Sequence, residues 1–244
     1  MTDSRKPVFL VIGAGAGIGG NAAMRFAAGG YHAVLARRSD EEGLARMVGQ
    51  IEAAGGTASG TLLNAAEDGS IEELVSRVEA DIGPIHAALY NLGAQIGNRA
   101  LDQTPHRIFE LGWRLGTYGV FRLAHALFPA MVERAKTGAH GTLLVTSATA
   151  AVRGNAGQHS HAAAMGGRRM LCQTLNAEFA PKGIHVAHFV IDGGIRSAQR
   201  PVPTDNPDSL LDPDAIAETY WATLQQHRSA WSWEVEVRPW VEKF

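Results

Sequence analysis

The amino-acid sequence predicts an α/β fold, in which a parallel sheet is built from βαβ units within a single domain spanning residues 1–244. Two observations support this prediction. Short apolar and β-branched runs alternate along the chain with longer amphipathic stretches, a pattern typical of strands joined by crossover helices. A chain of 244 residues can bury one large core, so its length does not require a second domain.

Seven runs are short and apolar enough to form strands. They are predicted at residues 7–13, 31–36, 57–63, 85–90, 141–147, 184–191 and 233–237. Between them, six amphipathic stretches predict helices at 17–28, 41–54, 70–82, 105–136, 160–180 and 213–227. Each of the six gaps between consecutive predicted strands is filled by one helix, as expected for successive βαβ units.

Local signals mark three of the helix starts. Ser70 with Glu73 matches a capping box, in which each side chain satisfies a free main-chain N–H group. Thr104 and Asp212 each precede a proline, so each predicts an N-cap followed by a residue whose fixed φ suits the first turn.

The segment 193–211 interrupts the alternation. It contains Pro201, Pro203 and Pro207, few apolar residues and no hydrophobic period, so it is predicted to be a long loop. A loop of this length in a compact domain is usually functional, and we expect it to cover a substrate.

Composition excludes several classes of partner. The chain has 22 Lys and Arg against 24 Asp and Glu, too balanced for a nucleic acid or an anionic membrane to be expected. Cys172 is the single cysteine, so no internal disulfide can form, and we expect this side chain to be buried as a small apolar group. The apolar run at 8–12 is far too short for a signal or membrane segment. A cytoplasmic protein is expected.

A glycine-rich loop follows the first predicted strand. Gly13, Gly15, Gly17 and Gly19, with Ile18, stand between that strand and the next helix. A pyrophosphate requires bare main-chain N–H groups beside the positive end of a helix, and glycines leave room for its approach. The position of the loop therefore predicts a dinucleotide site; the alternative is that the glycines only make a tight strand-to-helix crossing.

The end of the second strand indicates which dinucleotide is bound. An acidic residue there would bond the ribose 2′-hydroxyl of NAD, whereas arginines attract the 2′-phosphate of NADP. The chain has Arg37 and Arg38 directly after Ala36. This favours NADP over NAD, unless the two arginines are merely solvated loop residues.

Four segments resemble motifs of the short-chain dehydrogenase/reductase superfamily. They are the glycine loop at 13–19, Tyr-Asn-Leu-Gly at 90–93, the run at 178–184 and Asp-Gly at 192–193. The resemblance implies a doubly wound, Rossmann-type, seven-stranded parallel sheet with helices on both faces. It also implies a nicotinamide cofactor, an alcohol or carbonyl substrate whose identity stays open, and a homotetramer with contacts around Tyr118 and Leu175.

The same resemblance assigns further residues to the cofactor site. Asn64, at the end of the third strand, is expected near the adenine, where its amide offers both a donor and an acceptor. Asn91 and Gly93 end the fourth strand and Gly193 follows the sixth, which places all three beside the glycine loop if the family's architecture holds.

The catalytic tetrad of the superfamily has no match. Counting back from the motif at 178–184 places His161 at the family's tyrosine and Met165 at its lysine. Ala148 then stands at the serine and Gly116 at the asparagine. The nearest basic residues, Arg168 and Arg169, lie nearly a helical turn beyond Met165 and need not face the cofactor.

His161 nevertheless offers a coherent replacement for the tyrosine. An imidazole titrates near pH 6.5 and needs no neighbouring cation to act as a general acid or base at neutral pH. The alternatives are a pseudoenzyme that binds NADP(H) without catalysis, and a lyase or isomerase on the same scaffold. A metal site is not predicted, because His159 and His161 diverge in direction on a helix.

Overall fold

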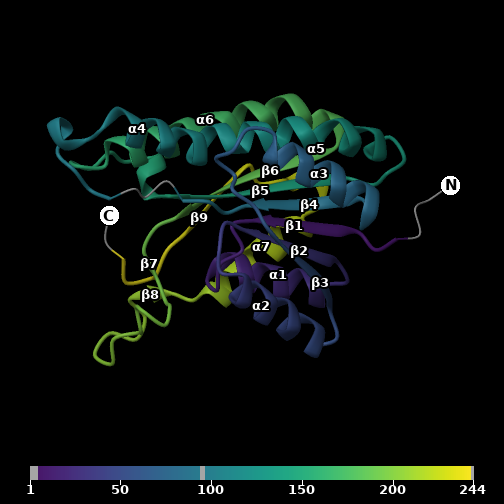
Figure 1. Ribbon diagram of the computed structural model, residues 1–244, viewed down its shortest axis with the longest axis horizontal. Coiled ribbons are helices and arrows are strands. Elements are labelled where there is room, and N and C mark those ends of the chain that lie inside the picture. Colours follow the sequence, from purple (N-terminus) through teal and green to yellow (C-terminus); the bar gives the residue numbers. More distant parts are fainter. Residues whose placement is uncertain (1–4, 94–96, 243–244) are drawn as a thin grey trace.

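The computed structural model describes residues 5–93 and 97–242, and its centre is a seven-stranded parallel sheet (Figure 1). The strand order is β3-β2-β1-β4-β5-β6-β9, and every neighbouring pair is parallel. The strands are β1 (Val8–Ile12), β2 (His32–Arg37), β3 (Thr57–Leu62), β4 (Ile85–Tyr90), β5 (Gly141–Ala148), β6 (Ile184–Ile191) and β9 (Glu234–Val237). All seven predicted strands are confirmed, and no end differs from the prediction by more than one residue.

Helices cover both faces of this sheet, as predicted (Figure 1). The helices are α1 (Ile18–Ala28), α2 (Glu41–Ala53), α3 (Ser70–Asp81), α4 (His106–Trp113), α5 (Gly119–Ala135), α6 (His159–Phe179) and α7 (Pro213–Leu224). One core packs α1, α2 and α7 against the sheet, and the other packs α3, α5 and α6 against its opposite face. The order of strands reverses at β1 and β4, which is the topology of a doubly wound sheet.

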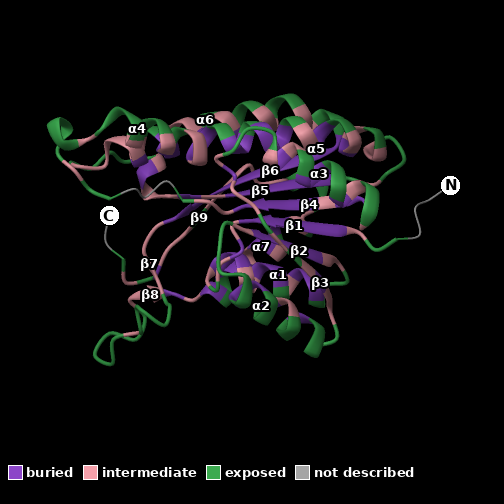
Figure 2. Cartoon of the chain, viewed as in Figure 1, coloured by how far each residue is buried: buried purple, intermediate pink, exposed green. Residues whose placement is uncertain are grey.

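Burial explains why the strand sequences lack a polar alternation. Every residue of β1 and of β6 is buried, because helices cover both sides of a parallel sheet. Figure 2 shows the central strands β1, β4, β5 and β6 mainly in the colour of buried residues, while the outward faces of the helices are exposed. The continuous apolar runs in the sequence therefore follow directly from the two-sided core.

The predicted capping residues are correct at one helix and wrong at two, although all three helices begin within one residue of the predicted start. Asp212 caps α7 by accepting a hydrogen bond from the main-chain N–H of Asp214 at 3.0 Å. Ser70 does not form a capping box: Gly69 occupies the N-cap at φ 80°, and the Ser70 hydroxyl donates to two main-chain carbonyls of the preceding turn. Thr104 likewise donates to a carbonyl behind it. Both hydroxyls donate to main-chain carbonyls of the loop before the helix, and these hydrogen bonds compete with capping.

The predicted helix at 105–136 is interrupted by a turn of π-helix. This segment, η2 (Arg114–Tyr118), separates α4 from α5. Its Leu115 carbonyl accepts a hydrogen bond from the Tyr90 hydroxyl at 2.6 Å, and Gly119 follows where a Cβ would lie 1.9 Å from that hydroxyl oxygen. Helical periodicity does not reveal such a turn, because the partners that take up its carbonyls lie elsewhere in the chain.

The segment 193–211 is mostly irregular, as predicted, but its two ends pair. β7 (Gly194–Ile195) and β8 (Leu210–Leu211) form a short parallel ribbon that projects away from the main sheet in Figure 1. The ribbon fixes the base of the loop just beyond the carboxyl end of β6.

A buried histidine should make the stability of the fold depend on pH. His188 lies on β6 with no exposed side-chain surface, and burial lowers its pKa to about 4, although the Glu234 carboxylate beside it opposes this shift. The unfolded chain takes up a proton near pH 6.5 and the folded chain does not. The free energy of unfolding should therefore fall by about 2 kcal/mol between about pH 7.5 and 5.

Urea unfolding at these two pH values would measure the effect. His188→Gln should reduce the pH dependence, whereas His227→Gln, at an exposed position, serves as the control and should not. A ring titration of His188 near pH 6.5 by NMR would contradict the prediction.

Candidate cofactor and active site

A single cleft opens where the carboxyl ends of the central strands meet. In a parallel sheet these ends lie along one edge, and the reversal of strand order leaves a crevice there. The cleft has a volume of about 410 Å³. Its lining comprises Gly13, Gly15, Gly17, Ile18, Gly19, Asn91, Leu92, Gly93, Thr146, Ser147, Ala148, His161, Met165, Arg168, Ile191, Gly193, Ile195, Arg196 and Ser197. Nine of the residues predicted for the site from the sequence are thus brought together.

Two different structural requirements explain why glycine stands at the four glycine positions of the loop. Gly13 has φ +98°, and a Cβ on Gly19 would lie 2.4 Å from the Gly13 carbonyl oxygen, so these two allow the close crossing of β1 and α1. A Cβ on Gly15 or Gly17 would meet no atom within 4 Å. These two positions instead leave the main chain open toward the cleft, at the amino-terminal end of α1. The loop therefore fits a pyrophosphate.

Asn91 and Gly193 frame the loop from neighbouring strands. The Asn91 side-chain amide donates a hydrogen bond to the Gly13 carbonyl at 3.0 Å, which joins the end of β4 to the glycine loop. Gly193, after β6, has φ +149°, and a Cβ there would lie 2.7 Å from the ring of Pro239. Each residue is needed for the shape of the cleft even before any ligand is considered.

Three predicted cofactor residues lie beside the cleft, outside its lining. Arg37 ends β2 and forms an ion pair with Asp40 at 3.1 Å. Arg38 follows it and is exposed. Asn64 lies just beyond β3, where its amide nitrogen donates to Glu67 at 2.8 Å. All three are on the β2–β3 side of the glycine loop, the side on which the 2′-position of a bound adenosine would lie.

The opposite side of the cleft contains His161. Its imidazole is 8% exposed, and its Nδ1 atom is buried without a hydrogen-bond partner among the described residues. Burial, and then the positive charge of Arg168, lower the pKa of His161 below its usual value of 6.5. The ring is therefore neutral at neutral pH. Nearby, the hydroxyl of Ser147 donates to the Met165 sulfur at 3.6 Å.

Arg168 is a residue of the cleft that the sequence analysis did not assign to the site. It lines the cleft and is 1% exposed. Seven residues separate it from His161, which corresponds to two turns and the same face of α6. This spacing is a signal that could have placed it; the distance from Met165 alone was misleading.

The Arg168 guanidinium is held entirely by main-chain carbonyls. It donates hydrogen bonds to the carbonyls of Leu92, Leu115, Gly116 and Thr146, so it connects the ends of β4 and β5 with the π-helical turn η2. The ring of Tyr90 lies 5.3 Å away, measured from its centroid to the Arg168 Cζ atom. No carboxylate among the described residues forms an ion pair with this cation.

Other candidate groups do not contribute to the cleft. Tyr118 is 39% exposed on the outer face of the helix layer. Cys172 is fully buried, as predicted, and burial raises the pKa of its thiol to about 12. Within residues 5–93 and 97–242, no group of three or more histidine, cysteine or acidic side chains is placed to hold a metal ion. Across those same residues, no helix has the length and apolarity needed to cross a membrane.

Comparison with known proteins agrees with this architecture. A family model described as short chain dehydrogenase matches residues 7–200. The 3-oxoacyl-acyl-carrier-protein reductase FabG of Escherichia coli (strain K12) is 30% identical over 182 residues, which are 73% of this chain and 70% of the relative.

Two solved structures extend the comparison over nearly the whole chain. A short-chain dehydrogenase from Rhodopseudomonas palustris is 33% identical, with a TM-score of 0.83 over 97% of this chain and 100% of the other. An alcohol dehydrogenase from Thermococcus sibiricus, complexed with 5-hydroxy-NADP, is 21% identical and superposes with the same TM-score over 97% and 98%. The chain therefore belongs to the short-chain dehydrogenase family of NAD(P)-binding oxidoreductases.

Proposed function

We propose that this protein is an NADP(H)-dependent oxidoreductase of an alcohol or carbonyl compound, in which His161 acts as the general base or acid. The observation that supports this most directly is the position of His161. Its imidazole and the glycine loop line the same cleft, so a titratable group lies where the reacting end of a bound dinucleotide would be expected.

The residues of the cleft fit NADP(H). The open main chain at Gly15 and Gly17 and the amino terminus of α1 suit the pyrophosphate, while Arg37 and Arg38 suit the 2′-phosphate. When bound, the nicotinamide supplies hydride transfer. The NADP and 5-hydroxy-NADP complexes of two structural relatives support this choice of cofactor.

The environment of His161 favours one direction of proton transfer. A neutral imidazole accepts a proton from an alcohol, as a general base does. To donate a proton to a carbonyl it must first be protonated, and burial together with Arg168 opposes that state. We therefore propose that His161 works as a base in alcohol oxidation at neutral pH.

A second candidate is a pseudoenzyme that binds NADP(H) and does not catalyse. The observation in its favour is that Gly116, Ala148 and Met165, at the other three tetrad positions, offer no titratable group. Both candidates require the same cofactor site, and they differ in whether the His161 imidazole exchanges a proton with a substrate.

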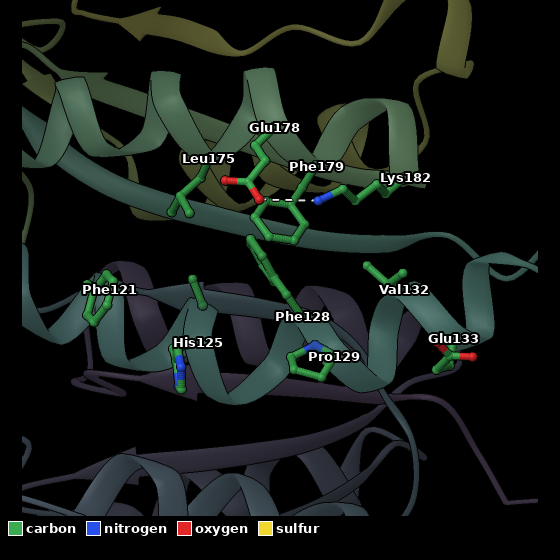
Figure 3. A pocket seen from close by; sticks show the side chains of 11 residues that line it. Phe121, His125, Phe128, Pro129, Val132, Glu133, Leu175, Glu178, Phe179 and Lys182 are labelled. Atoms are coloured by element: carbon green, nitrogen blue, oxygen red, sulfur yellow. Dashed lines mark hydrogen bonds and ion pairs between the residues drawn. The ribbon is translucent and has the colours of Figure 1, made fainter.

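We also propose that the chain assembles through the outer face of α4, α5 and α6. A cavity of about 540 Å³ lies between α5 and α6. Figure 3 shows Phe128, Leu175 and Phe179 among the side chains that point into it. Large apolar side chains are exposed along the same layer: Phe109, Trp113, Tyr118, Phe121 and Met170. A second copy of the chain would cover these groups, and the family resemblance suggests a homotetramer. The proposed location is the cytoplasm, where the lone Cys172 stays reduced.

The cofactor proposal predicts tighter binding of NADPH than of NADH. Charged hydrogen bonds to the 2′-phosphate contribute about 1.5 to 3 kcal/mol, so Arg37→Ala should weaken NADPH about tenfold or more and leave NADH unchanged. Titration by tryptophan fluorescence would measure both affinities. Arg46→Ala removes an exposed charge from α2 and is the matched control. Equal affinities of the unaltered protein for the two cofactors would contradict the proposal.

The base proposal predicts a pH-dependent oxidation. Activity on a panel of primary and secondary alcohols with NADP⁺ should decline as the pH falls through the lowered pKa of His161. His161→Phe should lose roughly two to four orders of magnitude in kcat while still binding NADPH. His159→Phe, the same change two residues earlier, should remain active. Full activity of His161→Phe would exclude this role; NADPH binding without turnover of any compound would favour the pseudoenzyme.

The assembly proposal predicts a tetramer in solution at micromolar concentration. Phe121→Glu places a charge on the apolar layer and should shift the molar mass measured by light scattering toward that of one chain. Met24→Glu alters a comparably exposed apolar side chain on α1, across the sheet, and should leave the tetramer intact. A monomeric unaltered protein would refute the proposal.

A further inference from the structure

We propose that Arg168 makes the cleft distinguish the two redox states of the nicotinamide, so that the reduced cofactor binds more tightly than the oxidised one. This inference rests on the proposed NADP(H) site and concerns binding alone. It does not depend on whether the protein turns over a substrate.

The charge of Arg168 is not neutralised by its surroundings. All of its hydrogen bonds go to main-chain carbonyls, which orient the guanidinium but leave its net charge in place. The titratable groups that act on it are Tyr90, Cys172 and Tyr220, and burial raises the pKa of each. These three groups are therefore uncharged at neutral pH. An arginine remains protonated even when burial lowers its pKa.

A second arginine of the cleft provides a contrast. Arg196 also lines the cleft, but it forms an ion pair with Asp212 at 2.7 Å and lies 3.9 Å from Asp214. The two carboxylates compensate the charge of Arg196. Because 44% of its side chain is exposed, water also screens its electric field. Arg168 is therefore the uncompensated buried cation among the described residues that line the cleft.

The topology places this cation on the nicotinamide side of the site. Arg37 and Arg38, the candidates for the adenosine 2′-phosphate, lie at the end of β2. A dinucleotide that crosses the glycine loop from there extends over β4 and β5. The carbonyls of Leu92 and Thr146, which hold Arg168, belong to that part of the sheet edge.

Charge then decides which redox state is favoured. The oxidised nicotinamide ring carries a positive charge and the reduced ring carries none, while the rest of the molecule is the same. A buried cation repels the oxidised ring, and at an effective dielectric constant near 20 the repulsion across a cleft corresponds to about a tenfold difference in affinity. Met165 adds no charge that would oppose it.

The experiment compares dissociation constants for NADPH and NADP⁺ at about pH 8 by isothermal titration calorimetry, with no substrate present. The unaltered protein should bind NADPH about tenfold more tightly than NADP⁺. Arg168→Lys keeps the charge and should keep the preference. Arg168→Gln retains two N–H donors without the charge and should bring the two affinities together. Arg169→Gln changes the adjacent, half-buried arginine, paired with Glu234 at 2.6 Å, and should leave the preference for the reduced cofactor unchanged.

The outcomes distinguish failure of the inference on Arg168 from failure of the proposed NADP(H) site. If neither cofactor binds, the proposed function fails as well. If both bind equally well, or if Arg168→Gln retains the preference of the unaltered protein, the inference on Arg168 is overturned and the cofactor proposal stands.

Arg168→Gln could fail to fold, because it leaves carbonyls without partners. In that case the unaltered protein is titrated with tetrahydro-NADP, whose partly hydrogenated nicotinamide ring is uncharged. Affinity close to that of NADPH supports the charge argument, and affinity close to that of NADP⁺ contradicts it.

Discussion

The architecture of the cleft depends on one buried cation. A guanidinium that is 1% exposed needs its N–H groups satisfied, and in this protein four main-chain carbonyls from three parts of the chain satisfy them. The widened helical turn η2 is the part that adapts, because a π-helix leaves carbonyls free to point sideways. Helix α6, the ends of β4 and β5, and the break between α4 and α5 are therefore parts of one arrangement around Arg168.

This arrangement relates the unusual tetrad positions to one another. Gly116 has no side chain and contributes only its carbonyl, which accepts from Arg168. Met165 supplies a sulfur atom for the Ser147 hydroxyl instead of a charge. The Arg168 guanidinium thus lines the cleft nearly one helical turn beyond Met165. Its positive charge helps to lower the pKa of His161.

Most of the fold could be predicted from the sequence, because strands buried on both faces and amphipathic helices each have a local period. The glycine loop could also be predicted, because its motif is one continuous run of the sequence. The cap at Ser70 could not be predicted, because its hydroxyl bonds to two carbonyls of the preceding turn instead. The break at Arg114–Tyr118 could not be predicted either, because it depends on Tyr90, which is distant in the sequence. Arg168 was missed because an arginine is expected at the surface, and only the carbonyls of other elements make its burial tolerable. Arg37, Arg38 and Asn64 lie beside the cleft, outside its lining, and their contact with a cofactor stays a prediction.

Two adjacent arginines fix the register of α6 against the sheet. Arg168 points inward to neutral carbonyls, while Arg169 extends to the Glu234 carboxylate on the edge strand β9. The two environments are not interchangeable, because one requires burial among dipoles and the other a paired negative charge. Insertion or deletion of one residue between His161 and Arg168 would rotate the helix face by about 100° and separate both side chains from their partners. In evolution this helix is therefore free to change its residues far more readily than its length.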